Sequence, residues 1–128
     1  MKSNTFVQPK KISDQILDNL VRQYIRLISG GYCKRCKRSS YIEVAHMFGR
    51  RRKTVRWDLK NVYPLCSECH RDVDNDAIKK ASFLYDVMTS QEIGNLQRIA
   101  NMTIKDYPID REKIRADLRN KIKELREL

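Results

Sequence analysis

With 128 residues, of which 41% are hydrophobic and 34% charged, the chain is long enough for one domain with a modest core, and its composition excludes a wholly disordered protein. No apolar run is long enough to span a membrane and no secretory signal opens the chain, so we expect a reducing, cytoplasmic setting. The formal net charge is +11, and residues 33–60 carry ten Lys or Arg against two acidic residues. This block indicates contact with a polyanion, most simply nucleic acid phosphate; a basic surface kept for solubility is the alternative.

The N-terminal part of the chain predicts a loose arm followed by a helix. Residues 1–12 form the arm in this interpretation, and residues 13–32 hold the helix. Its apolar residues recur at helical spacing from Ile16 to Ile28, and Gly30 with Gly31 should stop it.

Residues 76–128 predict a helical C-terminal region. One helix should cover Asp76 to Met88, and a second Ser90 to Asn101, where Thr89 and Glu92 form a capping-box pattern. A last helix should start at Asp110 with its apolar residues on one face. That face can pack on the chain's own core or on a second copy, so a homodimer is one expectation.

Four cysteines form two pairs of identical spacing. Cys33 and Cys36 bracket two residues, as do Cys66 and Cys69, and 29 residues separate the pairs. Two such turns can aim four thiolates at one point, which predicts a closed, structural zinc site. A dithiol redox pair and free core cysteines are the alternatives.

The segment between the cysteine pairs predicts a two-stranded hairpin. Residues 41–46 alternate as a strand, a basic loop follows over 47–60, and residues 61–66 should form the returning strand. A helix should begin near Ser67 and pass through His70. The expected fold is therefore one mainly helical domain with a small ββα finger, residues 33–75, held together by zinc.

Within this finger, His46, Asn61 and His70 are framed by the two cysteine pairs, and this arrangement resembles the HNH endonuclease superfamily, whose fold is called ββα-metal. A longer match is similar to phage recombination endonucleases of the NinG (Rap) kind, and it covers about residues 33–75. That match comprises Ala45–Arg50, Thr54–Asp58, Asn61 and Leu65–His70. If the chain is of phage origin, its setting is the cytoplasm of a bacterial host.

The resemblance implies a metal-dependent DNA endonuclease that hydrolyses phosphodiester bonds, with branched recombination intermediates as candidate substrates. His46 would be the general base and Asn61 would brace the loop beside it. His70 would bind a catalytic Mg²⁺ or Mn²⁺, and Asp74, one helical turn further on, is a candidate second ligand.

One position departs from the family pattern. Many HNH proteins place a metal-binding Asp or His immediately before the general base, and Ala45 stands there in this chain. Glu43, on the same strand face, is a candidate replacement, and Asp58 in the loop is another. The departure also keeps open a second function, a non-catalytic, zinc-stabilised DNA-binding protein with a degenerate HNH site.

The basic loop supplies the expected contacts to DNA, which should be mainly to phosphates rather than to bases. These candidates are Arg50, Arg51, Arg52, Lys53 and Arg56. Trp57 in the same loop is expected to belong to the core rather than to a base-stacking surface.

Overall fold

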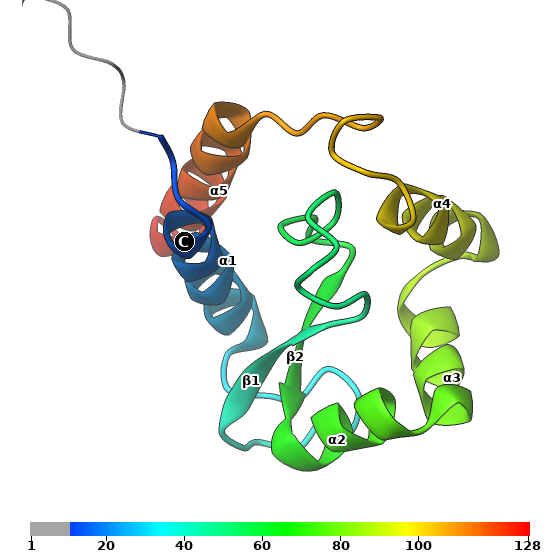
Figure 1. Cartoon of the computed structure of the whole chain (residues 1–128). Helices are drawn as coiled ribbons and strands as arrows, with labels where there is room; N and C mark the ends of the chain where they lie inside the picture. The colour runs from blue at the N-terminus through cyan, green and yellow to red at the C-terminus, as the bar shows by residue number, and fades with distance from the viewer. Residues whose placement is uncertain (1–10) are drawn as a thin grey trace, which may run out of the picture.

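Helices and one small sheet make up residues 11–128, the part of the chain that the computed structural model describes (Figure 1). The elements are α1 (Asp14–Ser29), β1 (Ile42–His46), β2 (Val62–Cys66), α2 (Ser67–Asn75), α3 (Ala77–Val87), α4 (Ser90–Ala100) and α5 (Arg111–Arg126). The mainly helical class with a small two-stranded sheet is therefore confirmed. Within these residues no helix is both long and apolar enough to cross a membrane.

The two strands are antiparallel, and their register places Ile42 opposite Cys66 and His46 opposite Val62. The loop that joins them lies between two groups of helices, with α1 and α5 on one side and α2, α3 and α4 on the other (Figure 1). Because side chains alternate along a strand, neighbouring residues of β1 face different groups. Ala45 packs in the cluster that contains α2–α4, whereas Val44 packs against the cluster that contains α1.

Helix α1 begins after Ser13 and ends before Gly30, which the sequence predicts to stop it. The Ser13 side chain accepts a hydrogen bond from the Ile16 amide at the start, and Gly30 adopts a left-handed φ of 59° at the end. The helix is therefore shorter than the segment 13–32 assigned to it. Helix α5 packs along α1 and buries Leu118 and Ile122, so its apolar face is used within the chain.

The predicted arm, residues 1–12, falls for the most part outside the described residues. Ile12 is described, and there the prediction is wrong: its side chain is 6% exposed and packs with Leu17 and Trp57. Its carbonyl also accepts a hydrogen bond from Arg111 of α5 at 3.0 Å. The apolar side chain and the helix-bound carbonyl attach this residue to the core.

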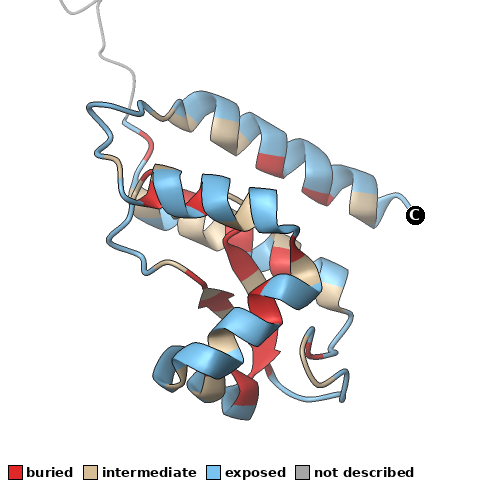
Figure 2. Ribbon diagram, turned by 90° about the vertical axis from the view of Figure 1, so that its right-hand side faces the viewer, coloured by how far each residue is buried: buried red, intermediate tan, exposed pale blue. Residues whose placement is uncertain are grey.

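The core consists of two clusters that meet at the sheet, and the buried residues follow the strands and the inward faces of the helices (Figure 2). One cluster joins Ala45 and Leu65 of the strands to Phe83 and Leu96 of α3 and α4. The other joins α1 and α5 to Trp57 and Val62. The sheet thus separates an α1 side, where Val44 packs, from an α2 side, and the candidate site residues divide between them.

Candidate metal centre and histidine site

The four cysteines come together at the end of the sheet where β2 meets α2. Their ligand atoms all lie within 4.8 Å of one another, with the Cys36 and Cys66 sulfurs 3.9 Å apart, and all four are free thiols. Three of the side chains are buried and Cys36 is half-buried. The cysteines are positioned to hold a metal ion, and a closed set of four thiolates is compatible with structural zinc.

Local geometry explains how each pair turns its two thiols toward one point. The Cys36 amide lies 3.5 Å from the Cys33 sulfur, and the Cys69 amide lies 3.4 Å from the Cys66 sulfur, so both pairs form the same turn. Lys37 completes the first turn in the left-handed region at φ 67°. In the second turn, Cys66 ends β2 and its sulfur caps the N-terminus of α2.

The protein environment moves the pKa values of these thiols in opposite directions. Hydrogen bonds from the Arg38 backbone and side chain lower the pKa of Cys36 to about 6, whereas burial raises the pKa of Cys69 to about 12. Four thiolates within 4.8 Å of one another repel each other, and a divalent cation compensates their charge. Binding of a metal is therefore expected to release protons.

His46 ends β1 on the α1 side of the sheet. Its Nε2 lies 3.0 Å from the main-chain carbonyl oxygen of Arg56 in the loop. A carbonyl oxygen only accepts hydrogen bonds, so Nε2 carries the proton in the neutral ring and Nδ1 keeps its lone pair. Burial is the main cause that lowers the pKa of His46 below its usual 6.5, which favours this neutral form at pH 7.

Asn61 is fully buried and ties the loop to the start of β2. Its side-chain oxygen accepts a hydrogen bond from the Phe48 amide at 2.7 Å, and its side-chain nitrogen donates to the carbonyls of Phe48 and Val55 at 3.0 and 3.1 Å. Its own carbonyl accepts from the Met47 amide at 2.8 Å. Asn61 thus braces the loop that presents the Arg56 carbonyl to His46.

His70 lies on α2, which packs on the opposite side of the sheet from α1. Its Nδ1 is 2.7 Å from a Glu43 oxygen, and its Nε2 is 3.3 Å from an Asp74 oxygen. The two carboxylates therefore meet opposite edges of one imidazole. Among the described residues, only the cysteines bring three or more candidate ligand atoms to one point, so His70 and Glu43 form a two-ligand set with Asp74 beside it.

Two carboxylates of α1 neutralise part of the charge of the basic loop. Asp18 pairs with Arg50 and Arg56, and Asp14 pairs with Lys53 and more weakly with Arg56. The Arg56 side chain is only 13% exposed, so it fastens the loop to α1. A phosphate contact from Arg56 would require these pairs to open.

The other two basic residues predicted to touch DNA differ from each other. Arg52 donates to the Ala100 carbonyl and to the Asn101 side chain, which docks the loop on the end of α4. Arg51 is exposed, and no ion pair is found for it among residues 11–128. Of the five, Arg51 is therefore the residue whose charge is most available.

Sequence reasoning missed Asp14 and Asp18. They are the only acidic residues among the first 32 and lie one helical turn apart. The available signal was their spacing of four residues, which places both carboxylates on one face of the predicted helix. Asp18 also accepts a hydrogen bond from the Trp57 indole at 2.8 Å, which confirms Trp57 as a core residue with a satisfied N–H.

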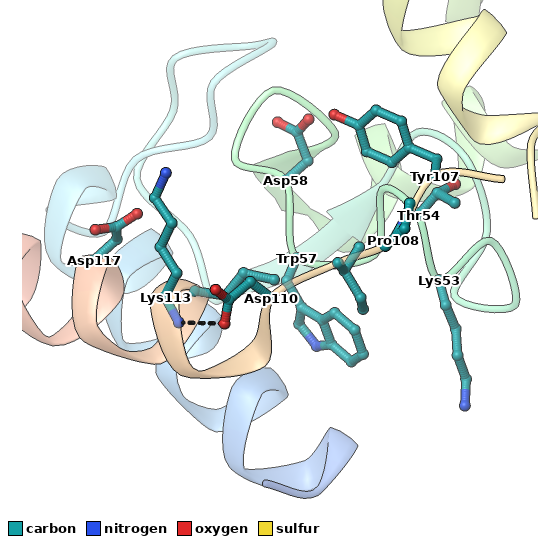
Figure 3. Close-up of a pocket in the computed structure, with 11 residues that line it drawn as sticks. Lys53, Thr54, Trp57, Asp58, Tyr107, Pro108, Asp110, Lys113 and Asp117 are labelled. Atoms are coloured by element: carbon teal, nitrogen blue, oxygen red, sulfur yellow. Dashed lines mark hydrogen bonds between the residues drawn. The ribbon is translucent and has the colours of Figure 1, made fainter. Parts of the chain in front are cut away.

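A cavity of about 460 Å³ lies between the loop and the segment that leads into α5 (Figure 3). Trp57, Tyr107 and Lys113 are among the residues that line it, and neither His46 nor His70 is. Asp58, the alternative metal ligand, lines this cavity and accepts a hydrogen bond from the Lys60 amide. Asp58 is therefore used in a turn away from the histidines.

The fold and the site define a mainly helical protein with a four-cysteine centre capable of metal binding, built on a two-stranded sheet. In comparisons with known proteins, no family model, no curated protein and no solved structure matches the chain.

Proposed function

We propose that the chain is a metal-dependent DNA endonuclease of the HNH type, with zinc at the four cysteines. The observation that carries this proposal is the pairing of His46 Nε2 with the Arg56 carbonyl at 3.0 Å. It leaves Nδ1 of a neutral imidazole as a proton acceptor at the end of a strand. A cavity of about 90 Å³, lined in part by Arg22 and Arg50, adjoins the ring.

Phosphodiester hydrolysis needs an activated water and compensation of the charge on the phosphate. In the proposed reaction His46 accepts the proton of the attacking water at Nδ1, while its Nε2–H stays on the Arg56 carbonyl. Asn61 holds that carbonyl in place through its hydrogen bonds to the loop. The low pKa of His46 keeps the base unprotonated near neutral pH.

His70 and Glu43, on the α2 side of the sheet, would hold a catalytic Mg²⁺ or Mn²⁺. Asp74 meets the other imidazole nitrogen, so it would orient the ring rather than bind the same ion. Imidazole with carboxylate is a donor set that fits a divalent ion, and Mg²⁺ commonly takes few protein ligands and keeps several waters. When bound, such an ion supplies charge stabilisation at the phosphate and the leaving oxygen. The closed cysteine set has no open position, so we assign zinc a structural role only.

A second candidate function is DNA binding without cleavage, with zinc as a structural element. Ala45 is fully buried among apolar side chains and provides no ligand, and Glu43 already contacts His70. Both candidates share the basic surface, and they differ only in whether His46 acts on a phosphate.

A cleavage assay separates the two functions. Zinc-loaded protein is incubated with Mg²⁺ or Mn²⁺ and with linear, nicked, forked and four-way DNA, beside His46→Ala and the surface control Lys121→Gln. We expect cleavage by the wild type and the control, with preference for branched substrates, and cleavage slower by about 10²-fold or more in His46→Ala. If the wild type cuts no substrate at any pH from about 6 to 9, around the unperturbed histidine pKa, the DNA-binding function replaces this one.

A further inference from the structure

Two hollows follow one another between α1 and β1. The first, of about 90 Å³, is lined by Arg22 of α1 and by Val44 and His46 of β1. The second, of about 230 Å³, is lined by Arg26 of α1 and by Tyr41 at the other end of the strand. The two hollows share no lining residue, and they lie at opposite ends of β1 beside the same helix. We refer to them together below as the α1–β1 trough.

Arg22 and Arg26 lie one helical turn apart on α1, and both are exposed. Arg22 donates to the Asn19 side chain at 3.0 Å. Arg26 donates to the Tyr41 hydroxyl at 2.9 Å, and its guanidinium lies 5.2 Å from the centre of that ring. Within residues 11–128 neither forms an ion pair with a carboxylate.

The charge of these two arginines is available because the acidic residue of the trough is already neutralised. Asp18 lines the first hollow, but it pairs with Arg50 and Arg56. The trough therefore presents an excess of positive charge beside His46. Its walls are the helix and the free edge of β1, since β1 pairs only with β2 in the described sheet.

We propose that the α1–β1 trough binds the sugar–phosphate backbone of one DNA strand, with Arg22 and Arg26 on successive phosphate positions. In this proposal the main DNA contacts come from α1, whereas the sequence indicates the basic loop. The four residues from Arg22 to Arg26 advance about 6 Å along the helix, and phosphates of one strand follow about every 3.4 Å of duplex axis. Two arginines at this spacing can therefore contact separate phosphates of the same strand.

This proposal rests on the proposed nuclease function and adds to it, because the trough would determine which DNA strand reaches His46. Arg22 shares the first hollow with His46, so the phosphate that Arg22 binds lies at or next to the one that is cut. The guanidinium of Arg26, stacked against Tyr41, anchors the strand further along β1.

The test measures DNA binding without cleavage, using the full chain loaded with zinc and no added Mg²⁺ or Mn²⁺. A fluorescent DNA duplex is titrated at several salt concentrations with wild type, Arg22→Gln/Arg26→Gln and the charge-matched control Lys105→Gln/Lys121→Gln. Both control residues are exposed and line neither hollow. Thermal melts check that each variant keeps its fold.

We expect the slope of log affinity against log salt to fall by about two units in the Arg22/Arg26 variant, one for each lost phosphate contact, and to stay at the wild-type value in the control. Arg22→Lys/Arg26→Lys should keep most of the slope, since the charge is retained. Equal slopes in the two Gln variants would overturn the proposal.

Two competition experiments identify the ligand. Inorganic phosphate, a free anion, should compete only at concentrations far above those of DNA phosphate. Poly-glutamate represents an acidic protein partner, and displacement of DNA by it at equal charge concentration would overturn the assignment to DNA. Because binding is measured without the catalytic metal, a wild type that binds through the trough but never cuts would contradict the nuclease and leave the trough supported.

Discussion

Asp18 of α1 accepts two hydrogen bonds from the guanidinium of Arg56, at 3.1 Å from Nε and 2.7 Å from Nη2. The main-chain carbonyl of the same Arg56 accepts the hydrogen bond of His46. A residue 38 positions earlier in the chain thus fixes the backbone that sets the tautomer of the histidine. Bidentate pairing of this kind restricts both position and orientation.

Removing the charge of Asp18 is expected to destabilise the fold. Burial raises the pKa of Asp18, but hydrogen bonds from Arg56, Trp57 and Arg50 outweigh it and lower the pKa from 3.8 to about 2. This difference corresponds to about 2 kcal/mol of stability at pH 7. Asp18→Asn should lose about that amount in urea denaturation, whereas Asp86→Asn, at an exposed position of α3, should lose almost none.

The pH dependence of that loss has a definite sign. A carboxyl group whose pKa is lowered by folding contributes its stability above the unfolded value of 3.8 and loses it as the pH falls toward 2. The difference between wild type and Asp18→Asn should therefore be largest at neutral pH and shrink below pH 3.8. A difference independent of pH would show that the loss comes from packing rather than from charge.

Removal of the metal is expected to unfold the finger. We predict one zinc per chain in protein purified without added metal, and replacement of any of the four cysteines by Ser should release it and reduce the helical circular dichroism signal. The reason is that the binding energy of such a site is folding energy. Elemental analysis that finds no zinc, or disulfides between the pairs, would contradict this prediction.

The two histidines should respond differently to substitution. His46→Ala should lower the cleavage rate by about 10²- to 10⁴-fold, the usual contribution of a general base, and added metal should not restore it. His70→Ala should lose activity that excess Mg²⁺ or Mn²⁺ partly restores, because a ligand is lost rather than the base. Rescue of His46→Ala by metal would reverse the two assignments.

The pH profile of cleavage should reflect the buried position of His46. Only the neutral imidazole accepts a proton, and burial lowers the pKa of His46. The rate should therefore fall with decreasing pH at a midpoint below 6.5, and the free energy of unfolding should also decrease as the pH falls through that range. Nuclear magnetic resonance titration of the histidine ring protons measures the same pKa directly; a value at or above 6.5 would contradict the prediction.

Arg51 and Arg56 should separate DNA binding from stability. Arg56→Gln breaks the pairs with Asp18 and should lower the melting temperature. Arg51→Gln removes an exposed charge, so it should leave the melting temperature unchanged and weaken DNA binding by a similar factor for all sequences. The two variants carry the same charge change and serve as controls for each other.

The sequence predicts the finger well because its signals are local. Each cysteine pair lies within four residues, and the strands next to the loop follow an alternation of period two. The helix starts follow from capping residues, because Ser13, Thr89 and Asp110 each accept a hydrogen bond from a backbone amide in the first turn of their helix. These features depend on residues a few positions apart, so they can be predicted from the sequence alone.

The partners of the basic loop could not be predicted in this way. Asp18 lies 38 residues from Arg56, and the pair forms only because α1 packs against the loop. A count of charges by segment gives residues 33–60 an excess of eight but does not show that Asp14 and Asp18 of another segment neutralise part of it. Within the described residues, Arg56 pairs with carboxylates and Arg22 does not, and this contrast is likewise a property of the packed structure.

Cys66 occupies the junction of β2 and α2, and it lies 30 residues after Cys36 in the chain. A metal ion shared by both pairs would close a loop of that length, and the chain entropy of closing it is about 3 kcal/mol. Contacts between β1 and β2 are nonlocal and slow to form unless the ends of the loop are already joined. The metal would therefore act as a nucleus for folding: chains that bind it early should pair their strands quickly, whereas chains synthesised under zinc limitation should expose the apolar faces of the sheet and aggregate.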